Sequence, residues 1–388
     1  MVDETPGSAA APYRAFLPDL SQPRFTTMQT QDAHSYAAAF KTGRRPPWLH
    51  ALYEHWQALW QEPYRGVTND GHVRPGLFPL EDEGVDDAAV GAAADRVVAL
   101  VQADPQLRAK QLVYHIDDPS WRTWSNPEFL LSDRGVRLDE VGETVRTAVL
   151  DVLRAALSPE GFAKAQGAMR INGFLGALVG AEAVVNEWSY NFVLYGVFPV
   201  GGGGGGRRPW GFSFYGHHLC LNAFFTGGGQ MVLSPVFVGA EPNVIDRGPN
   251  GDEGDDHPYV GTRILVAEEA LGLRLMRSLA PAVQAQATVY AQLRDPAMPH
   301  GRWNHDDQRH LCGAARDNRV VPYEGVASPV LLVEFDHHSG VFLTNAEPAR
   351  FHIHTIVRTP NAGDYGMALR PLLPSTVEQK FIWEGDQE

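Results

Sequence analysis

The stretch PWGFSFYGHHLCLNAFFTGGGQMVLSPVFV, residues 209–238, carries the pattern that most directly indicates the fold. Aromatic and β-branched side chains are enriched in segments 210–225 and 230–238, which predicts two strands. Between them, Thr226–Gly229 ends in a run of glycines and predicts a tight hairpin connection. Consecutive strands joined by a short turn run antiparallel, so the sequence predicts an antiparallel sheet here.

Helical and strand-like segments are unevenly distributed along the rest of the chain. Apolar residues at helical spacing dominate the first half, and strands dominate the second half. The expected helices cover residues 48–60, 86–101, 138–157, 161–179 and 265–293, and the last is broken at Pro281. The further expected strands cover residues 188–199, 330–336 and 351–358. Because the strands follow one another without alternating helices, we expect an α+β fold with a helical N-terminal half and an antiparallel β-rich C-terminal half that includes one long helix.

The expected organisation is one domain preceded by an arm. Residues 1–30 are rich in Pro, Ala, Ser and Gln and are expected to form a flexible N-terminal arm. Residues 31–388 are expected to form a single α+β domain, in which 31–187 are mainly helical and 188–388 are β-rich and carry the site.

Composition limits the classes of function. The 388 residues include 32 Lys and Arg against 46 Asp and Glu, a net charge of −14, which disfavours nucleic acid and anionic membranes as partners. With only two cysteines the chain has no disulfide framework. No run approaches the ~18 uncharged apolar residues of a membrane span, and the first residues lack the pattern of a secretory signal. We therefore expect a cytoplasmic protein.

Histidines are concentrated in two strand-like segments. In His352-Ile353-His354 the two imidazoles fall on one face of a strand, about 7 Å apart. His217 and His218 are adjacent, so on a regular strand only one of them faces the same layer. Imidazoles from two strands can share a Zn, Fe, Cu or Mn ion, and the sequence predicts such a site from these four residues. The alternative is a set of hydrogen-bonded or surface histidines without a metal.

Other polar residues near these segments are candidates for the surrounding shell and for catalysis. Asp336 and the following His337 and His338 end one predicted strand. Asp336 and Asp364 could accept the second ring N–H of a metal-bound histidine. Arg358 follows His354 by four residues and could hold a substrate carboxylate in a bidentate manner. An ion pair between Arg358 and Asp364 is the equally weighted alternative. The predicted catalytic residues are therefore Asp336, His338, Arg358 and Asp364.

Seven long motifs lie between residues 110 and 370. They are WSNPEFLLSDRGVRLDE (124–140), LSPEGFAKAQGAMRINGFLG (157–176), NEWSYNFVLYG (186–196), PWGFSFYGHHLCLNAFF (209–225), SPVFVGAEPNVIDRGP (234–249), DQRHLCGAARDNRVVPYEGV (307–326) and VEFDHHSGVFLTNAEPARFHIHTIVRTPNAGDYG (333–366). These motifs resemble the Domain of Unknown Function 3500 family, in its fungal and actinobacterial branch. The resemblance implies shared His-His, His-x-His and Asp-Tyr/Phe-Gly elements and no assigned activity. It also implies a longer segment than the single residue that separates Val326 from Ser328 here.

These features together predict a metal-dependent enzyme. We expect a transition metal ion, Fe, Cu or Zn, held by His352, His354 and one or both of His217 and His218. Iron or copper would support oxidative chemistry on a small organic substrate, whereas zinc would support hydrolysis by lowering the pKa of bound water. A non-enzymatic protein that binds a small ligand through these histidines is the competing hypothesis.

Overall fold

The computed structural model describes residues 11–200, 208–251, 257–288, 318, 320 and 328–373. Its centre is a sheet of eight strands in the order β1-β3-β4-β5-β6-β8-β7, with β2 paired to β3. The strands are β1 Val113–Tyr114, β2 Val136–Arg137, β3 Tyr190–Gly196, β4 Trp210–Gly216, β5 Leu219–Phe225, β6 Met231–Ala240, β7 Leu332–His338 and β8 Ala349–Arg358. All described pairings are antiparallel except that of β1 with β3. The predicted α+β class is confirmed; the sheet is mixed, and the strands β3 to β8 pair antiparallel as predicted.

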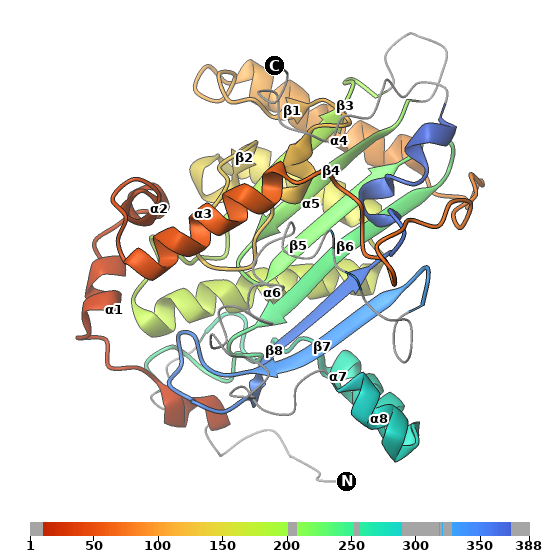
Figure 1. The fold of residues 1–388 in the computed structure, drawn as a ribbon. Coiled ribbons are helices and arrows are strands. Elements are labelled where there is room, and N and C mark those ends of the chain that lie inside the picture. Colours follow the sequence, from red (N-terminus) through yellow and green to blue (C-terminus); the bar gives the residue numbers. More distant parts are fainter. Residues whose placement is uncertain are drawn as a thin grey trace.

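Helices cover the sheet and flank it (Figure 1). They are α1 Pro23–Met28, α2 Ala33–Lys41, α3 Pro47–Gln61, α4 Asp87–Ala103, α5 Glu143–Ala156, α6 Pro159–Val179, α7 Val266–Ser278 and α8 Pro281–Ala287. Ser158 caps α6 by accepting a hydrogen bond from the Gly161 amide, and Pro159 occupies the first turn, where its missing N–H costs nothing. None of the described helices has the length and apolar character needed to cross a membrane.

Both faces of the sheet are buried, each by a different part of the chain. Alternate side chains point to opposite faces, so Leu194 and Phe212 belong to the large core with α4, α5 and α6. Tyr195 and Tyr215 belong to a second cluster, which contains Trp121 on a connecting segment. A third cluster packs α2 and α3 against residues 129–131. The buried residues of α1, Phe25 and Met28, belong to the large core.

The segment predicted as one strand over 210–225 is two strands. The prediction was wrong because His217 and His218 form a two-residue turn between β4 and β5. His218 adopts a φ of 60° in the left-handed region, which non-glycine residues rarely adopt. Its backbone N–H donates to both the carbonyl and the side-chain oxygen of Asn126, each at 3.1 Å. The turn has no Asn-Gly or Asp-Gly signal, so the local sequence did not reveal it.

The N-terminal segment also differs from the expected flexible arm. Residues 12–16 form a short 3₁₀ helix and α1 follows, and the Tyr13 ring is fully buried in the large core. The Arg14 guanidinium donates two hydrogen bonds to Asp246, at 2.8 and 2.9 Å. Polar composition at a chain end predicts disorder only when no buried side chain anchors the segment. Residues 1–10 of the predicted arm lie outside the described residues.

The helix predicted over 265–293 is interrupted as expected at Pro281. The described part consists of α7 and α8, and Pro281 takes the first position of α8. Proline at this position ends the preceding helix because its ring prevents the residue before it from staying helical. The remainder of that prediction, the Gly201–Gly206 run and the short connection before Ser328 all lie outside the described residues.

Candidate metal centre

Five histidines from three parts of the chain line one cavity of about 720 Å³. His217 and His218 come from the β4–β5 turn, His338 ends β7, and His352 and His354 lie on β8. All five histidines are buried. The turn explains why both adjacent histidines reach the cavity, since the strand alternation assumed for them does not apply to turn residues. The structure therefore brings together all four predicted metal ligands.

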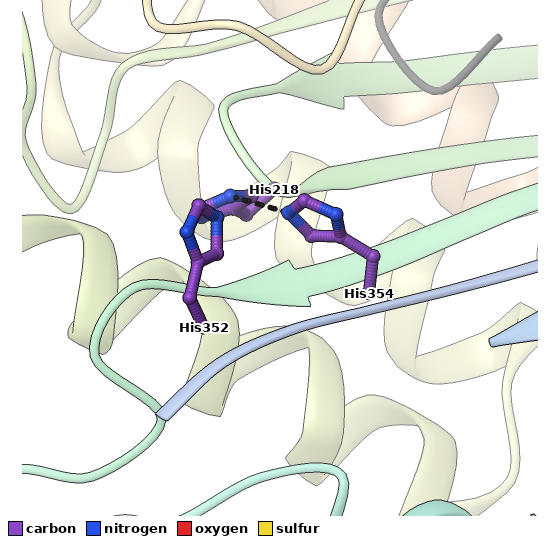
Figure 2. A group of neighbouring side chains, drawn as sticks. All are labelled: His218, His352 and His354. Atoms are coloured by element: carbon purple, nitrogen blue, oxygen red, sulfur yellow. Dashed lines mark hydrogen bonds between the residues drawn. The ribbon is translucent and has the colours of Figure 1, made fainter. Parts of the chain in front are cut away.

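Three of these imidazoles lie close enough together that they could hold a metal ion (Figure 2). His218, His352 and His354 each offer a ring nitrogen, and these three atoms lie within 4.8 Å of one another. The Nε2 atoms of His218 and His354 are 3.2 Å apart. Two nitrogens bound to one tetrahedral zinc at about 2.1 Å would be roughly 3.4 Å apart. His217 does not belong to this group of three, but its ring stacks on His218 with a centroid distance of 3.9 Å.

Backbone and amide oxygens fix the proton positions of the surrounding rings. Nδ1 of His352 lies 2.7 Å from the Ser339 carbonyl, and Nδ1 of His338 lies 2.8 Å from the same oxygen. A carbonyl only accepts, so both Nδ1 atoms must carry the proton. Their Nε2 atoms are then left with a lone pair, which is the form that binds metal. The buried Nε2 of His352 has no hydrogen-bond partner among the described residues.

His217 is oriented by an amide on α6. Its Nδ1 lies 2.8 Å from Oδ1 of Asn172, whose amide nitrogen donates to the Asn186 carbonyl and to Ser189 Oγ. Because the amide nitrogen is used in this way, the side-chain oxygen accepts and Nδ1 of His217 donates. The result is a third ring whose Nε2 is unprotonated.

A buried carboxylate supports the loop that holds Ser339. Oε1 of Glu241 accepts backbone hydrogen bonds from Val341, Phe342 and Leu343, at 2.8 to 3.0 Å. The same oxygen lies 3.7 Å from Nδ1 of His352. Burial raises the pKa of Glu241, although the three backbone donors oppose this rise. Glu241 thus anchors the loop whose carbonyl sets the tautomer of two histidines.

Burial favours the neutral form of His217, His218 and His352. It lowers the pKa of His217 to about 3, with smaller contributions from His354 and Arg24. It also lowers the pKa of His218 and His352 well below the usual value, and the neighbouring imidazoles add to this effect. A neutral imidazole has the free electron pair that a cation needs. For His217 and His352, the pKa shifts and the Nδ1 hydrogen bonds therefore favour the same, metal-competent form.

The polar residues predicted to surround the metal separate into those that lie at the site and those that lie away from it. Asp336 Oδ1 lies 3.0 Å from Nδ1 of His354, a close contact between a carboxylate and the ring that is not aligned as a hydrogen bond. The His338 ring centroid is 4.9 Å from that of His352, so both Asp336 and His338 are at the site. His337, in contrast, points to Glu269, 3.2 Å away, and does not line the cavity.

Arg358 and Asp364 are not among the residues that line the cavity. Four residues along a strand carry Arg358 about 13 Å from His354. Its Nε is 2.6 Å from Oδ2 of Asp364, and both side chains have no solvent exposure. Asp364 also accepts hydrogen bonds from Ser234 and Thr359. The structure places these two residues in the ion pair that was the alternative interpretation.

The cavity is also lined by polar residues that were not predicted from the sequence, among them Arg24, Tyr36, Asn126 and Glu128. Arg24 and Tyr36 come from α1 and α2, which belong to or follow the segment expected to be flexible. Asn126 and Glu128 lie in the WSNPEF motif, where polar residues between aromatic ones were the available signal. Nothing in the local sequence connects these residues to the histidines, because the contact depends on the packing of α1 and α2 beside the sheet.

Comparison with known proteins identifies the family. A family model described as "Protein of unknown function (DUF3500)" matches residues 83–328 and 325–367, and these ranges include all five cavity histidines. A search of curated proteins and a search of solved structures each find no match. Because the family model matches more than half of the chain, this protein belongs to the DUF3500 family.

Proposed function

We propose that this protein is a metal-dependent enzyme in which His218, His352 and His354 hold a transition metal ion. The proposed reaction is oxidative and acts on a small organic substrate. One observation carries the proposal: three buried imidazole nitrogens lie within 4.8 Å of one another beside a cavity of about 720 Å³. A cavity of this size accommodates a small organic molecule.

The residues present fit a metal ion in their chemistry as well as in their spacing. An unpaired buried nitrogen costs about 1–3 kcal/mol in folding free energy, and Nε2 of His352 is such an atom among the described residues. Coordination would remove that cost. Asp336 would orient His354, and the Ser339 carbonyl would orient His352. When bound, iron or copper would supply dioxygen activation at a coordination position left open by three protein ligands.

Zinc-dependent hydrolysis is a second candidate, favoured by one observation. Glu128 places a carboxylate in the wall of the same cavity, where it could accept a proton from an attacking water. Three neutral histidines are also the ligand set of catalytic zinc in some hydrolytic sites, where the pKa of bound water falls to about 7. The identity of the bound metal decides between the two reactions.

Metal analysis of protein produced without a histidine tag tests the proposal. We expect about one equivalent of iron, copper or zinc per folded chain. The double variant His352→Ala/His354→Ala should lose the metal, since only one of the three ligands would remain. The exposed residue His55 provides a control, and His55→Ala should retain the full metal content.

Two outcomes would overturn the assignment. A folded wild-type protein that cannot be loaded with iron, copper or zinc would favour a non-enzymatic, ligand-binding role for the cavity. Full metal content in the double variant would show that the ion binds elsewhere. Zinc in place of iron or copper would transfer the proposal to hydrolysis.

A further inference from the structure

A pair of opposite charges lies in the wall of the cavity. Nη2 of Arg24, on α1, is 3.4 Å from Oε1 of Glu128. The Glu128 side chain is only 6% exposed, whereas that of Arg24 is 40% exposed. Removing a carboxylate from water costs several kcal/mol unless close partners compensate, and a charge-assisted N–H···O bond is normally 2.7–2.9 Å long. The contact is therefore too long for Arg24 to compensate fully for the burial of Glu128.

Both side chains keep hydrogen-bonding capacity beyond this contact. A guanidinium has five N–H donors, and the hydrogen bonds of Arg24 to described residues go to the Val341 carbonyl and to Glu128. Glu128 accepts from Arg24 and from the Tyr36 hydroxyl, and both bonds use Oε1. An edge of the guanidinium and the second carboxylate oxygen thus remain available to a ligand.

The charged pair is close to the histidines and surrounded by apolar walls. Arg24 and Glu128 line the same cavity as the five histidines. The remaining wall includes Phe40, Leu49 and Phe129, which belong to the cluster formed by α2, α3 and residues 129–131. A ligand here would meet the cationic Arg24 and Arg45 and the anionic Glu128 next to a mainly apolar surface.

We propose that Arg24 and Glu128 bind the carboxylate and the ammonium group of a zwitterionic α-amino acid whose large apolar side chain packs on the aromatic wall. The identification of this ligand as the substrate rests on the proposed function, but the binding site itself does not. A simple carboxylic acid would place its charge beside Glu128, and a simple amine would place its charge beside Arg24. Only a ligand with both charges matches both groups.

Calorimetric titration of the full-length, metal-free protein with three related ligands tests this site. The ligands are L-tryptophan, indole-3-propionate, which lacks the ammonium group, and tryptamine, which lacks the carboxylate. We expect tryptophan to bind at least tenfold more tightly than either of the others. In Arg24→Gln, L-tryptophan and tryptamine should bind with similar affinity. In Glu128→Gln, L-tryptophan and indole-3-propionate should bind with similar affinity.

Matched variants separate recognition from a general loss of structure. Arg96 and Asp151 form a surface pair at 3.6 Å away from the cavity, so Arg96→Gln and Asp151→Asn should leave the order of affinities unchanged. Arg24→Lys retains the charge and should recover part of the preference, with circular dichroism confirming the fold of each variant. Equal or tighter binding of indole-3-propionate or tryptamine to the wild type would overturn the proposal, as would an unchanged tryptophan preference in Arg24→Gln and Glu128→Gln.

The same titration distinguishes this inference from the proposed metal function. A protein that takes up no metal but shows the tryptophan preference would remove the enzyme proposal and retain this site. A protein that binds metal but shows no preference for L-tryptophan, whether metal is bound or removed, would retain the enzyme proposal and remove this site.

Discussion

The two ends of strand β8 carry polar groups of opposite character. Near its start, His352 and His354 face a cavity, and His352 retains a buried nitrogen without a hydrogen-bond partner among the described residues. Near its end, Arg358 is paired at 2.6 Å with Asp364, which also accepts three hydrogen bonds from Ser234 and Thr359. Both ends are buried to a similar extent.

The difference shows how buried polar groups can be assigned a role. A buried group whose hydrogen-bonding capacity is satisfied within the protein stabilises the fold. A buried group with capacity left over, and with a cavity beside it, is a candidate for binding. Asp364, which accepts four hydrogen bonds from Arg358, Ser234 and Thr359, belongs to the first class. His352, which lines the cavity, belongs to the second. A substitution in the first class should reduce folding stability and leave metal binding unchanged, whereas a substitution in the second class should mainly reduce metal binding.

Removal of Asp364 should have the largest effect. Asp364→Ala leaves the buried Arg358 guanidinium without its carboxylate partner, and breaking such a pair typically costs about 3–5 kcal/mol of folding free energy. Urea unfolding measures this loss. Metal content per folded molecule should stay at the wild-type level, because Asp364 does not line the cavity. A loss of metal from the folded variant would place Asp364 in the site after all.

Removal of Asp336 should weaken metal binding and have a smaller effect on folding stability. Asp336 Oδ1 lies 3.0 Å from Nδ1 of His354, and loss of a carboxylate that orients a metal-bound histidine typically lowers metal affinity by about 10–100-fold. Competition with a chelator measures the affinity of Asp336→Ala. Because this side chain is 25% exposed, its removal should cost much less stability than Asp364→Ala. Unchanged affinity would contradict its assigned role.

The ion pair of the N-terminal segment should show the smallest effect, and one that depends on pH. Burial would raise the pKa of Asp246, but hydrogen bonds from Arg14 and Tyr13 outweigh it and lower the pKa to about 2. A lowered folded-state pKa stabilises the protein above the ordinary value near 3.8, and this contribution is lost as the pH falls towards 2.

Comparison with Asp246→Asn measures that contribution. At pH 6 the variant should be less stable than the wild type by about 1 kcal/mol, a value reduced for solvent screening. The difference should shrink as the pH falls from about 4 to 2 in thermal unfolding. A difference independent of pH in this range would show that the charge of Asp246 does not contribute. The metal content of Asp246→Asn should equal that of the wild type.

Much of the fold could be predicted because its signals are local. The pattern of apolar residues predicted α3, α4, α5, α6, β3 and β8 within a few residues. The errors arose where a local signal was absent or was overridden by packing. The His217–His218 turn lacks the residues typical of such turns, and the polar segment after residue 10 is held in place by the burial of Tyr13 and by the Arg14–Asp246 pair.

The candidate site was predictable only in part. His352 and His354 could be paired from sequence because strand alternation places them on one face. Asp336 and His338 could be suggested from their position at a strand end. Arg24 and Glu128 could not be connected with these residues, since α1 and the 126–129 segment meet the histidines through contacts distant in sequence.

The amino-acid sequence alone predicted the α+β class, the antiparallel β5–β6 hairpin and the histidine segments that supply the three proposed ligands, because each depends on spacing over a few residues. Only the tertiary structure decided which polar groups share a cavity. It separated Arg358 from the histidines on the same strand and brought Arg24 and Glu128 towards them. The physical reason is that a buried polar group is either satisfied within the protein or left available to a ligand, and this depends on neighbours that only the packing of distant segments supplies.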